Sequence, residues 1–333
     1  SLYRALQEYL PQSRVVYARG INCAGSDTAG IEEALRAASD ADVVILTLGG
    51  KNGWGITSTV GEGVDSTDIG LPGLQETFAR KVYALHKKTV VLHFDGRPLS
   101  NEFVASHFDA VLEVWQPGVM GGQALCKTLF GEYNPGGKLP VTAARNAGQL
   151  PVYYGLPRGS GYVSAGHTGM IRNKNGYIND TAFPLYYFGH GLSYTEFAYS
   201  EAEVERAQVT ARDVLAVSVD VENVGSLPGD EVVQLYFTDQ TASMVRPTME
   251  LAGFRRIRLQ PGEKKRVVFQ MKVSQMAFLN RHDNWVVEKG AFTLSIGSSC
   301  VDIRQTLQVE VTETARVDER TRGFYAQTTE KEV

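Results

Sequence analysis

The sequence predicts two domains, an α/β domain followed by an all-β domain, and three observations support this. The chain has 333 residues, of which 43% are hydrophobic and 21% are charged, as in globular proteins with room for two cores. Between residues 31 and 141, helical periods alternate with continuous apolar runs, which is typical of a parallel sheet covered by helices. After Gly191 the hydrophobic period becomes two, which is typical of antiparallel strands.

The α/β domain is expected to alternate helices with strands that are buried on both faces. The chain opens with Ser1 rather than Met, directly on a helical stretch, so we expect a truncated start. Ligands bind at the carboxyl ends of parallel strands. The loop from Lys51 to Gly70 follows one of these ends, so a site is expected there. The predicted helices are 2–10, 31–38, 74–86, 101–107 and 121–130, and the predicted strands are 43–48, 89–94, 110–114 and 139–142.

The all-β domain follows an irregular segment, residues 151–184, that is rich in Gly, Ser, Asn and Tyr. This segment is either a linker or a functional loop. About seven short strands in roughly 110 residues then predict an antiparallel β-sandwich with a supporting role. The tail from Thr314 is charged and aperiodic, and we expect no structure there beyond a docking segment. The predicted strands are 215–224, 231–237, 249–259, 265–273, 285–288, 291–296 and 306–311.

Charge and hydropathy exclude several classes of partner. The net charge is -4, and basic residues cluster only in short runs such as Lys264-Lys265-Arg266, so nucleic acid and anionic membranes are not expected partners. No apolar run approaches the length of a membrane span. The composition therefore predicts a soluble chain with a neutral or weakly polar substrate.

Cysteine and histidine usage indicates neither metal nor cofactor. Cys23, Cys126 and Cys300 are odd in number and far apart, so we interpret them as buried small side chains and expect no disulfide. The six histidines show no ligand-like spacing, so a metal site is not expected. Scattered free cysteines favour a reducing, cytoplasmic compartment.

Glu62 is the candidate catalytic residue. It lies in the run Gly61-Glu62-Gly63, within a glycine-hinged loop between a predicted strand and a predicted helix. Such a loop is where an acid catalyst would be held. From this loop alone, the alternative is that Glu62 is a solvated loop acid without a catalytic role.

Motifs across about 240 residues occur in the order found in one enzyme family, which makes the set specific although each motif is weak. By these motifs the chain resembles family 3 glycoside hydrolases of the β-glucosidase and β-xylosidase type. The motifs are Glu62-Gly63-Val64-Asp65, Leu71-Pro72-Gly73, Gly96-Arg97-Pro98-Leu99, Trp115-Gln116-Pro117-Gly118, Leu129 to Pro140, Gly148-Gln149-Leu150-Pro151, Phe188 to Thr195, Asn223-Val224-Gly225 and Gly229 to Tyr236.

The resemblance implies a three-part enzyme of which this chain carries the last two parts. The first part, a (β/α)8-type barrel with the aspartate nucleophile, is missing. The second would be a flavodoxin-like (αβ)6 sandwich domain without its opening strand, and the third a fibronectin type III-like domain. The implied boundaries are 1–150 for the sandwich domain, 151–191 for a connecting segment, 192–313 for the fibronectin type III-like domain and 314–333 for a tail.

By position, the resemblance assigns the general acid/base of a retaining β-glycosidase to Glu62. In such enzymes one carboxyl group protonates the leaving oxygen and then deprotonates water, about 5 to 5.5 Å from the nucleophile. The implied activity is hydrolysis of terminal non-reducing β-linked sugars, with β-glucosides favoured over β-xylosides and no turnover by the isolated chain. The implied partners are a β-glycoside or oligosaccharide and a barrel, upstream or on a separate chain, with a homo-oligomer as one possibility. No cofactor is implied.

Other residues of the loop have two interpretations each. Trp54 either lines a leaving-group subsite, with Asn52 nearby, or packs the loop onto its own domain. Asp65 either contributes to the site by bracing the loop or is solvated. Ser66 stands where the family usually has an arginine that would pair with loop carboxylates. Gly96-Arg97-Pro98 and Trp115 to Gly118 are interpreted as turn and interdomain packing residues.

Two alternative functions belong to other classes. The first is a noncatalytic carbohydrate-binding or interaction module of the same fold. The second is a nucleotide-binding or flavin-binding domain, which is weak because Gly49-Gly50-Lys51-Asn52-Gly53 matches no phosphate-binding motif.

Overall fold

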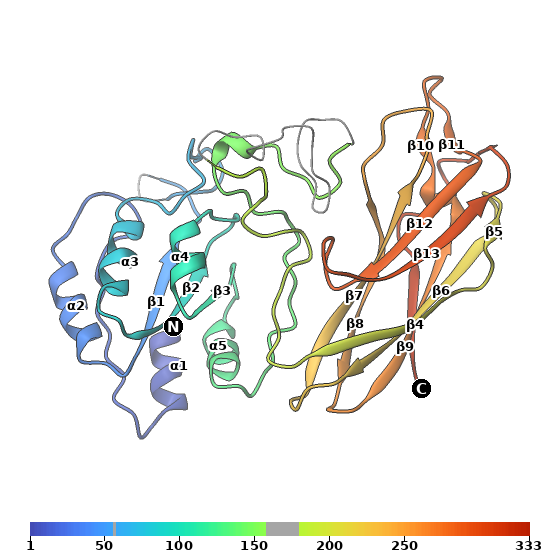
Figure 1. The fold of residues 1–333 in the computed structure, drawn as a ribbon. Helices are drawn as coiled ribbons and strands as arrows, with labels where there is room; N and C mark the ends of the chain where they lie inside the picture. Colours follow the sequence, from blue (N-terminus) through green and yellow to red (C-terminus); the bar gives the residue numbers. More distant parts are fainter. Residues whose placement is uncertain (56–57, 158–179) are drawn as a thin grey trace. The chain divides into compact units, whose positions relative to one another are not determined.

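The computed structural model of the chain describes residues 1–55, 58–157 and 180–333, so most of the predicted linker lies outside the described residues. It contains two compact units (Figure 1). The α/β unit comprises Ser1–Tyr133 and Ala143–Pro151, and the β unit comprises Asn134–Thr142 and Val152–Val333. The predicted order, an α/β fold followed by antiparallel β-structure, is confirmed.

The α/β unit is built on a three-stranded parallel sheet. Its order is β1-β2-β3, with Val43 opposite Lys88 and Val90 opposite Ala110. The strands are β1 (Val43–Gly49), β2 (Lys88–Phe94) and β3 (Ala110–Glu113), and the helices are α1 (Leu2–Tyr9), α2 (Ile31–Ser39), α3 (Gln75–Tyr83), α4 (Glu102–His107), α5 (Gly121–Leu129) and the short η1 (Ala147–Gln149).

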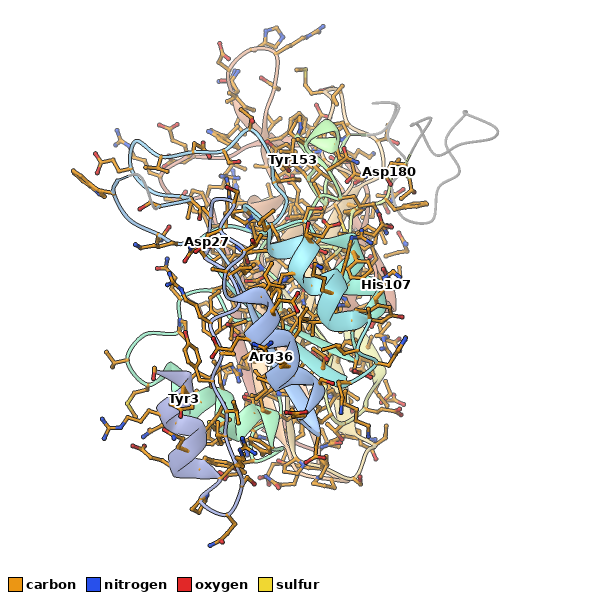
Figure 2. All side chains as sticks on the ribbon, turned by 90° about the vertical axis from the view of Figure 1, so that its left-hand side faces the viewer. Tyr3, Asp27, Arg36, His107, Tyr153 and Asp180 are labelled. Atoms are coloured by element: carbon orange, nitrogen blue, oxygen red, sulfur yellow. The ribbon has the colours of Figure 1, made fainter. Side chains whose placement is uncertain are left out.

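Apolar side chains at helical spacing place α2, α3 and α4 against the sheet. Ile31, Phe78 and Val104 from these helices share one buried core with Leu46 and Val91 of the sheet. Helix α1 packs instead against α5, and the two helices are close enough that a Cβ on Gly122 would lie 3.1 Å from the Cβ of Ala5. Figure 2 shows the side chains, with Tyr3, Arg36 and His107 marking α1, α2 and α4.

Two expectations for this part of the chain are wrong. Strand β1 is not buried on both faces, because it lies at the edge of the described sheet and exposes Val43 and Thr47. Residues 139–142 form no strand. Leu139 exchanges two backbone hydrogen bonds with residues 189 and 190, both of 2.8 Å, but Pro140 has no N–H with which to extend the pairing.

The β unit contains two packed sheets of orders β5-β13-β12-β7-β8 and β15-β9-β6-β4, with a small sheet β10-β11-β14. Alternate residues face the core, as with Leu215, Val217 and Val219 of β6. The elements are β4 (Phe197–Val204), β5 (Gln208–Val209), β6 (Val214–Asn223), β7 (Gly229–Asp239), β8 (Glu250–Leu259), β9 (Lys264–Lys272), η2 (Val273–Met276), β10 (Phe278–Leu279), β11 (Trp285–Val287), β12 (Gly290–Gly297), β13 (Ile303–Val311), β14 (Ala315–Arg316) and β15 (Gln327–Glu332).

Two longer strands, β4 and β15, were not predicted from the sequence. Strand β4 has a register shift between Ser200 and Glu203, with Glu201 at φ 48°, which interrupts the period of two. The tail was expected to lack structure, and this is wrong, because β15 pairs along β9 from Gln327 to Glu332. Its charged sequence suits an edge strand, where charges discourage pairing with other molecules. Within the described residues, no helix has the length and apolar character needed to cross a bilayer.

Removal of β15 tests whether this tail belongs to the fold. Deleting residues 327–333 is expected to lower the free energy of unfolding by about 1–3 kcal/mol, since backbone hydrogen bonds are lost while the chain entropy of ordering the strand is recovered. The deletion also removes Glu330, which pairs with Arg255 and Lys265. Urea unfolding measures the change, with deletion of the exposed Val333 alone as the control. Equal stability of the two truncated chains would refute a structural role for β15.

Candidate active site

The loop that carries Glu62 begins at the carboxyl end of β1 and is closed at its base by backbone pairing. Gly49 has φ +136°, and a Cβ there would lie 2.0 Å from the Phe94 carbonyl oxygen, so glycine is required where the loop starts. Lys51 N donates to Thr59 Oγ1 (2.8 Å), and Thr59 N donates to the Lys51 carbonyl (2.9 Å). Gly50 N also donates to the carbonyl of Phe94 in β2 (2.9 Å), so the base of the loop is fixed to the sheet.

Glu62 lies at the tip of this loop. Gly61 and Val64 exchange two backbone hydrogen bonds of 3.1 Å each, which closes a tight turn around Glu62 and Gly63. Glu62 is exposed, and within the described part of the chain its carboxylate accepts no hydrogen bond and forms no ion pair. Both carboxylate oxygens are thus presented to solvent by a turn whose backbone is hydrogen-bonded.

The other predicted site residues lie on the same loop in different environments. Trp54 is 78% exposed, which is the opposite of packing onto its own domain. The side chain of Asn52 lies against Gly96, where a Cβ would come within 2.9 Å of it. Loop geometry therefore places Trp54 outward and Asn52 toward the neighbouring β2–α4 connection.

The carboxylate of Asp65 has two polar contacts although its side chain is 92% exposed. Its carboxylate accepts the N–H of Ser66 (2.8 Å), and Oδ1 lies 3.3 Å from Nη1 of Arg97. Ser66, at the position of the expected arginine, accepts the N–H of Asp68 through its hydroxyl (3.1 Å). A guanidinium does reach the loop carboxylate, but it comes from another connection of the sheet.

Arg97 is the residue that the sequence interpretation missed, since it was assigned to turn and packing roles. It is the third residue after β2, and its side chain is 18% exposed. Neighbouring parallel strands bring the loops at their carboxyl ends together, but this general rule does not identify which side chains of the two loops meet.

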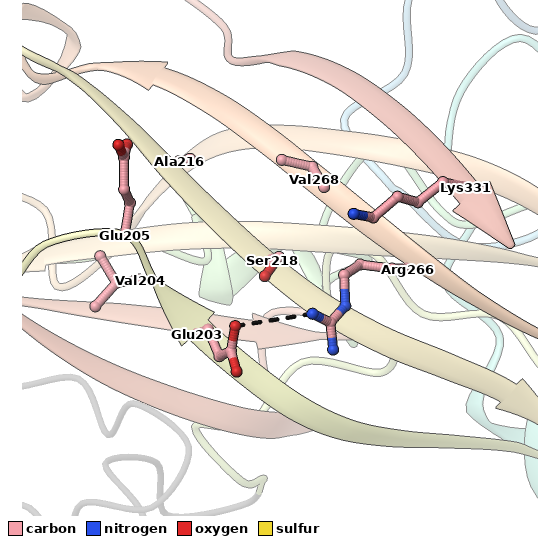
Figure 3. A pocket seen from close by; sticks show the side chains of 8 residues that line it. All are labelled: Glu203, Val204, Glu205, Ala216, Ser218, Arg266, Val268 and Lys331. Carbon is pink, nitrogen blue, oxygen red and sulfur yellow. Dashed lines mark ion pairs between the residues drawn. The ribbon is translucent and has the colours of Figure 1, made fainter. Parts of the chain in front are cut away.

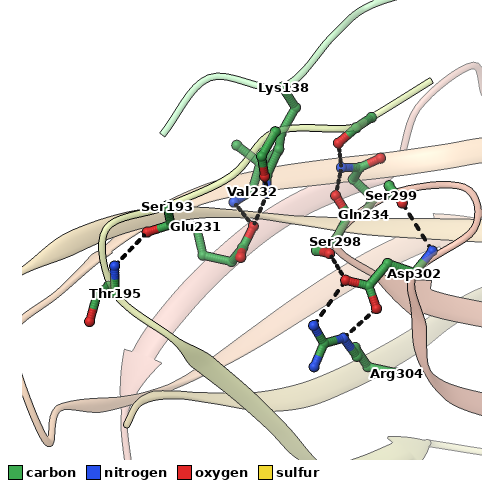
Figure 4. Close-up of polar contacts among 12 residues, drawn as sticks. Lys138, Ser193, Thr195, Glu231, Val232, Gln234, Ser298, Ser299, Asp302 and Arg304 are labelled. Carbon is green, nitrogen blue, oxygen red and sulfur yellow. Dashed lines mark hydrogen bonds and ion pairs between the residues drawn. The ribbon is translucent and has the colours of Figure 1, made fainter. Parts of the chain in front are cut away.

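Residues of the later motifs contact one another inside the β unit (Figure 4). We interpret these contacts as stabilising the fold rather than forming a candidate site. Lys138 Nζ donates to the Gly191 carbonyl (2.9 Å) and lies 3.2 Å from Glu231 Oε1, with side chains 11% and 6% exposed. Burial raises the pKa of Glu231, and the Lys138 ammonium opposes this more weakly. Asn134 and Ser193 also exchange hydrogen bonds.

The four-stranded sheet of the β unit has an open groove on its outer surface, formed by β4, β6, β9 and β15 (Figure 3). Glu203 lies 3.8 Å from Arg266 across it. No aromatic side chain is among the lining residues, so the groove lacks the flat apolar face on which a sugar ring stacks. The lining residues are Glu203, Val204, Glu205, Ala216, Ser218, Arg266, Val268 and Lys331.

Cys126 and Cys300 are free and buried, which confirms their interpretation as buried small side chains, but Cys23 is only partly buried, so that interpretation is wrong for Cys23. Burial raises the pKa of the Cys300 thiol to about 12, so it is an unreactive packing residue. Among residues 1–55, 58–157 and 180–333, no three His, Cys, Asp or Glu side chains are arranged to hold a metal ion.

Comparison with known proteins agrees with both units. Residues 1–194 match the Glycosyl hydrolase family 3 C-terminal domain, and residues 231–300 match the Fibronectin type III-like domain. A β-xylosidase of Formosa agariphila is 37% identical over 286 residues, which are 86% of this chain and 38% of that protein. A periplasmic β-glucosidase of Salmonella typhimurium is 36% identical over 284 residues, 84% of this chain and 36% of that protein.

Solved structures show the same relationship. A β-glucosidase of Erythrobacter marinus aligns with a TM-score of 0.83 at 35% identity, over 94% of this chain and 43% of its own. A β-glucosidase of Listeria innocua in complex with gluconolactone aligns with a TM-score of 0.83 at 31% identity, over 94% of this chain and 42% of its own. The chain spans less than half the length of these proteins.

An α/β unit that matches the family 3 C-terminal domain, followed by a fibronectin type III-like sandwich, places the chain in the class of glycoside hydrolases with this C-terminal organisation. The chain belongs to glycoside hydrolase family 3 and carries its C-terminal domain and the fibronectin type III-like domain. The resemblance in the sequence motifs is thereby confirmed.

Proposed function

We propose that this chain is the C-terminal part of a retaining β-glycosidase and supplies its general acid/base, Glu62. The substrates are terminal non-reducing β-linked sugars, with glucosides preferred and xylosides next. The aspartate nucleophile comes from a barrel domain that precedes this part or is carried by a separate chain.

One observation carries the proposal: Glu62 stands exposed at the tip of a hydrogen-bonded turn, beyond the carboxyl end of a parallel strand. A carboxyl group that serves a nucleophile on another domain has to project from its own domain in this way. Relatives that cover this chain almost fully are named β-glucosidases and β-xylosidases, which supports the reaction class.

The proposed chemistry has two steps. In the first, the carboxyl group of Glu62 gives its proton to the glycosidic oxygen while the barrel aspartate attacks the anomeric carbon, so that the leaving alcohol departs neutral. In the second, the Glu62 carboxylate takes a proton from water as that water attacks the anomeric carbon and releases the aspartate. Trp54, Asn52 and Asp65 are the residues we propose around the leaving group, since all three lie on the loop of Glu62.

The experiment compares the 333-residue chain alone with the same chain joined to a family 3 barrel. The chain alone is expected to show no turnover of aryl β-glucosides, because it lacks the nucleophile. The joined protein is expected to hydrolyse aryl β-glucosides, and aryl β-xylosides more slowly. Initial rates with both substrates measure this.

Two outcomes would count against the proposal. Hydrolysis by the purified chain alone would place a complete catalytic pair within it. A correctly folded joined protein that binds sugars without hydrolysis would favour the noncatalytic module instead. Circular dichroism of the joined protein establishes folding before the rates are compared.

A further inference from the structure

The turn Asp95-Gly96-Arg97, which follows β2, contacts the Glu62 loop at three successive points. A Cβ on Gly50 would lie 2.2 Å from Asp95 Oδ2 and 2.6 Å from Thr59 Oγ1, so the start of the loop rests on Asp95. Gly96 lies against the Asn52 side chain. Asp95 and Gly96 therefore contact different segments of the loop.

Asp95 fixes the shape of this turn. Its carboxylate is buried, and Oδ1 accepts the N–H groups of Gly96 (2.6 Å) and Arg97 (3.2 Å). Two backbone hydrogen bonds to one side-chain oxygen hold the turn in a single conformation and so direct the Arg97 side chain. Oδ2 has no hydrogen-bond partner within the described residues, and it faces Gly50 and Thr59.

Arg97 provides the third contact, with Asp65. The pair joins residues 32 positions apart, and the arginine is mostly buried while the carboxylate is exposed. The buried partner is thus the fixed one, and Asp65 is the group that is held. Asp65 directly follows Val64, which closes the turn around Glu62, so the pair anchors the outgoing end of that turn.

Arg97 also has unused capacity to bind a carboxylate. It contacts Asp65 through one nitrogen at 3.3 Å, and its buried Nε has no partner within the described residues. A guanidinium can bind a carboxylate through two parallel hydrogen bonds. The pair can therefore tighten, and hold the loop more firmly, when water is excluded from the site.

We propose that Asp95-Gly96-Arg97 is the positioning element for Glu62, and that the Arg97–Asp65 pair sets where the tip of the loop stands. This rests on the proposed function. It assigns to Arg97 the role that the missing arginine at position 66 would have had.

The first test uses the chain as it is. In Arg97→Gln, backbone amide hydrogen exchange in residues 61–66 is expected to be about two- to fivefold faster, the range that an exposed ion pair supplies. Arg145→Gln is the matched control, because Arg145 is 20% exposed and pairs with Glu102 at 2.6 Å in the same unit. The control is expected to leave exchange in residues 61–66 unchanged. Unchanged exchange in Arg97→Gln would overturn the proposal.

The second test uses the chain joined to a family 3 barrel. Arg97→Gln is expected to reduce kcat/KM, which reports formation of the glycosyl-enzyme, by about 10- to 100-fold on a β-glucoside with a poor leaving group, because a displaced acid protonates the leaving oxygen less efficiently. An activated aryl glucoside should lose less. The charge-reversed double variant Asp65→Arg with Arg97→Asp should recover part of the loss that each single change causes.

The two proposals fail differently. If Glu62→Ala leaves both substrates unaffected, the acid/base assignment is wrong whatever Arg97 does. If Glu62→Ala shows the leaving-group dependence of an acid catalyst while Arg97→Gln behaves like Arg145→Gln, the positioning element is wrong and the function stands. Equal loss on both substrates in Arg97→Gln, without recovery in the double variant, would indicate a structural role and also overturn the proposal.

Discussion

In the chain joined to a family 3 barrel, Glu62→Ala is expected to slow hydrolysis of a disaccharide-type β-glucoside by about 10²- to 10⁴-fold, the range that general acid–base catalysis contributes. The alcohol that leaves from such a substrate is a poor leaving group, so under the proposed mechanism bond cleavage depends on a proton from Glu62. Steady-state kcat and kcat/KM on this substrate measure the loss.

An activated aryl glucoside separates the two steps of the reaction. Its leaving group needs little protonation, so formation of the glycosyl-enzyme should be affected far less, and the intermediate should accumulate because water lacks its general base. Added azide, which needs no base, should react with the intermediate and restore turnover, giving a glycosyl azide. Glu33→Ala, an exposed glutamate on α2, is the control and should change neither rate. Equal losses on both substrates, without rescue by azide, would contradict the assignment of Glu62.

Lys138→Met is expected to lower the free energy of unfolding of the β unit by about 3–5 kcal/mol, since removal of one partner leaves the other charge buried and uncompensated. Methionine keeps most of the apolar stem, so the loss reports on charge rather than on a cavity. The partner is Glu231, 3.2 Å from the ammonium. Chemical denaturation followed by a probe in the β unit measures the change.

The pH dependence of this loss identifies its cause. Burial raises the pKa of Glu231, and loss of Lys138 should raise this pKa further. The folded state of the variant then binds the Glu231 proton more tightly than the unfolded state does. The free energy of unfolding therefore rises as the pH falls through the folded pKa of Glu231, and it stops rising once the pH is below the unfolded pKa. The difference in free energy of unfolding between the variant and the unsubstituted chain should therefore be smaller at about pH 5 than at about pH 8.

Two further variants test the Lys138 prediction. Lys264→Met is the surface control, because Lys264 and Glu222 form a pair at 3.2 Å whose side chains are about one-third exposed. It should cost about 0–1 kcal/mol. The double variant Lys138→Met with Glu231→Leu should recover most of the loss, because no buried charge remains. A loss in Lys138→Met that matches the surface control and ignores pH would show that this pair is not needed for stability.

Much of the fold could be predicted from hydrophobic period alone. The run Val43 to Leu48 and the alternation from Leu215 onward became β1 and β6, since burial of apolar side chains is local to each element. Strand β4 could not be found in this way, because the shift beside Glu201 breaks the period. Strand β15 could not be found either, since a charged edge strand has no apolar face to reveal it.

The candidate site, like the fold, could be predicted only in part from the sequence. Glycines on both sides of Glu62 indicate a turn within one short stretch of chain, and the ordered motifs indicate the family. The 78% exposure of Trp54 argues against packing onto its own domain, and its place in a leaving-group subsite stays a proposal. Arg97 had no local feature that connects it to Asp65, because the two are joined only when β1 and β2 pair in parallel and bring the ends of their loops together.

By itself, the sequence determined the two kinds of domain, most helices and strands, the family resemblance and the choice of Glu62. The domains and their elements depend on short-range patterns of apolar residues, glycine and proline, whereas the resemblance and the choice of Glu62 depend on motifs that follow one another in a set order. The tertiary structure alone decided which charges meet: Arg97 with Asp65 across two loops, and Lys138 with Glu231 inside the β unit. The physical reason is that the energy of an ion pair depends on separation and burial, and both quantities are set by packing between segments that are distant in the sequence.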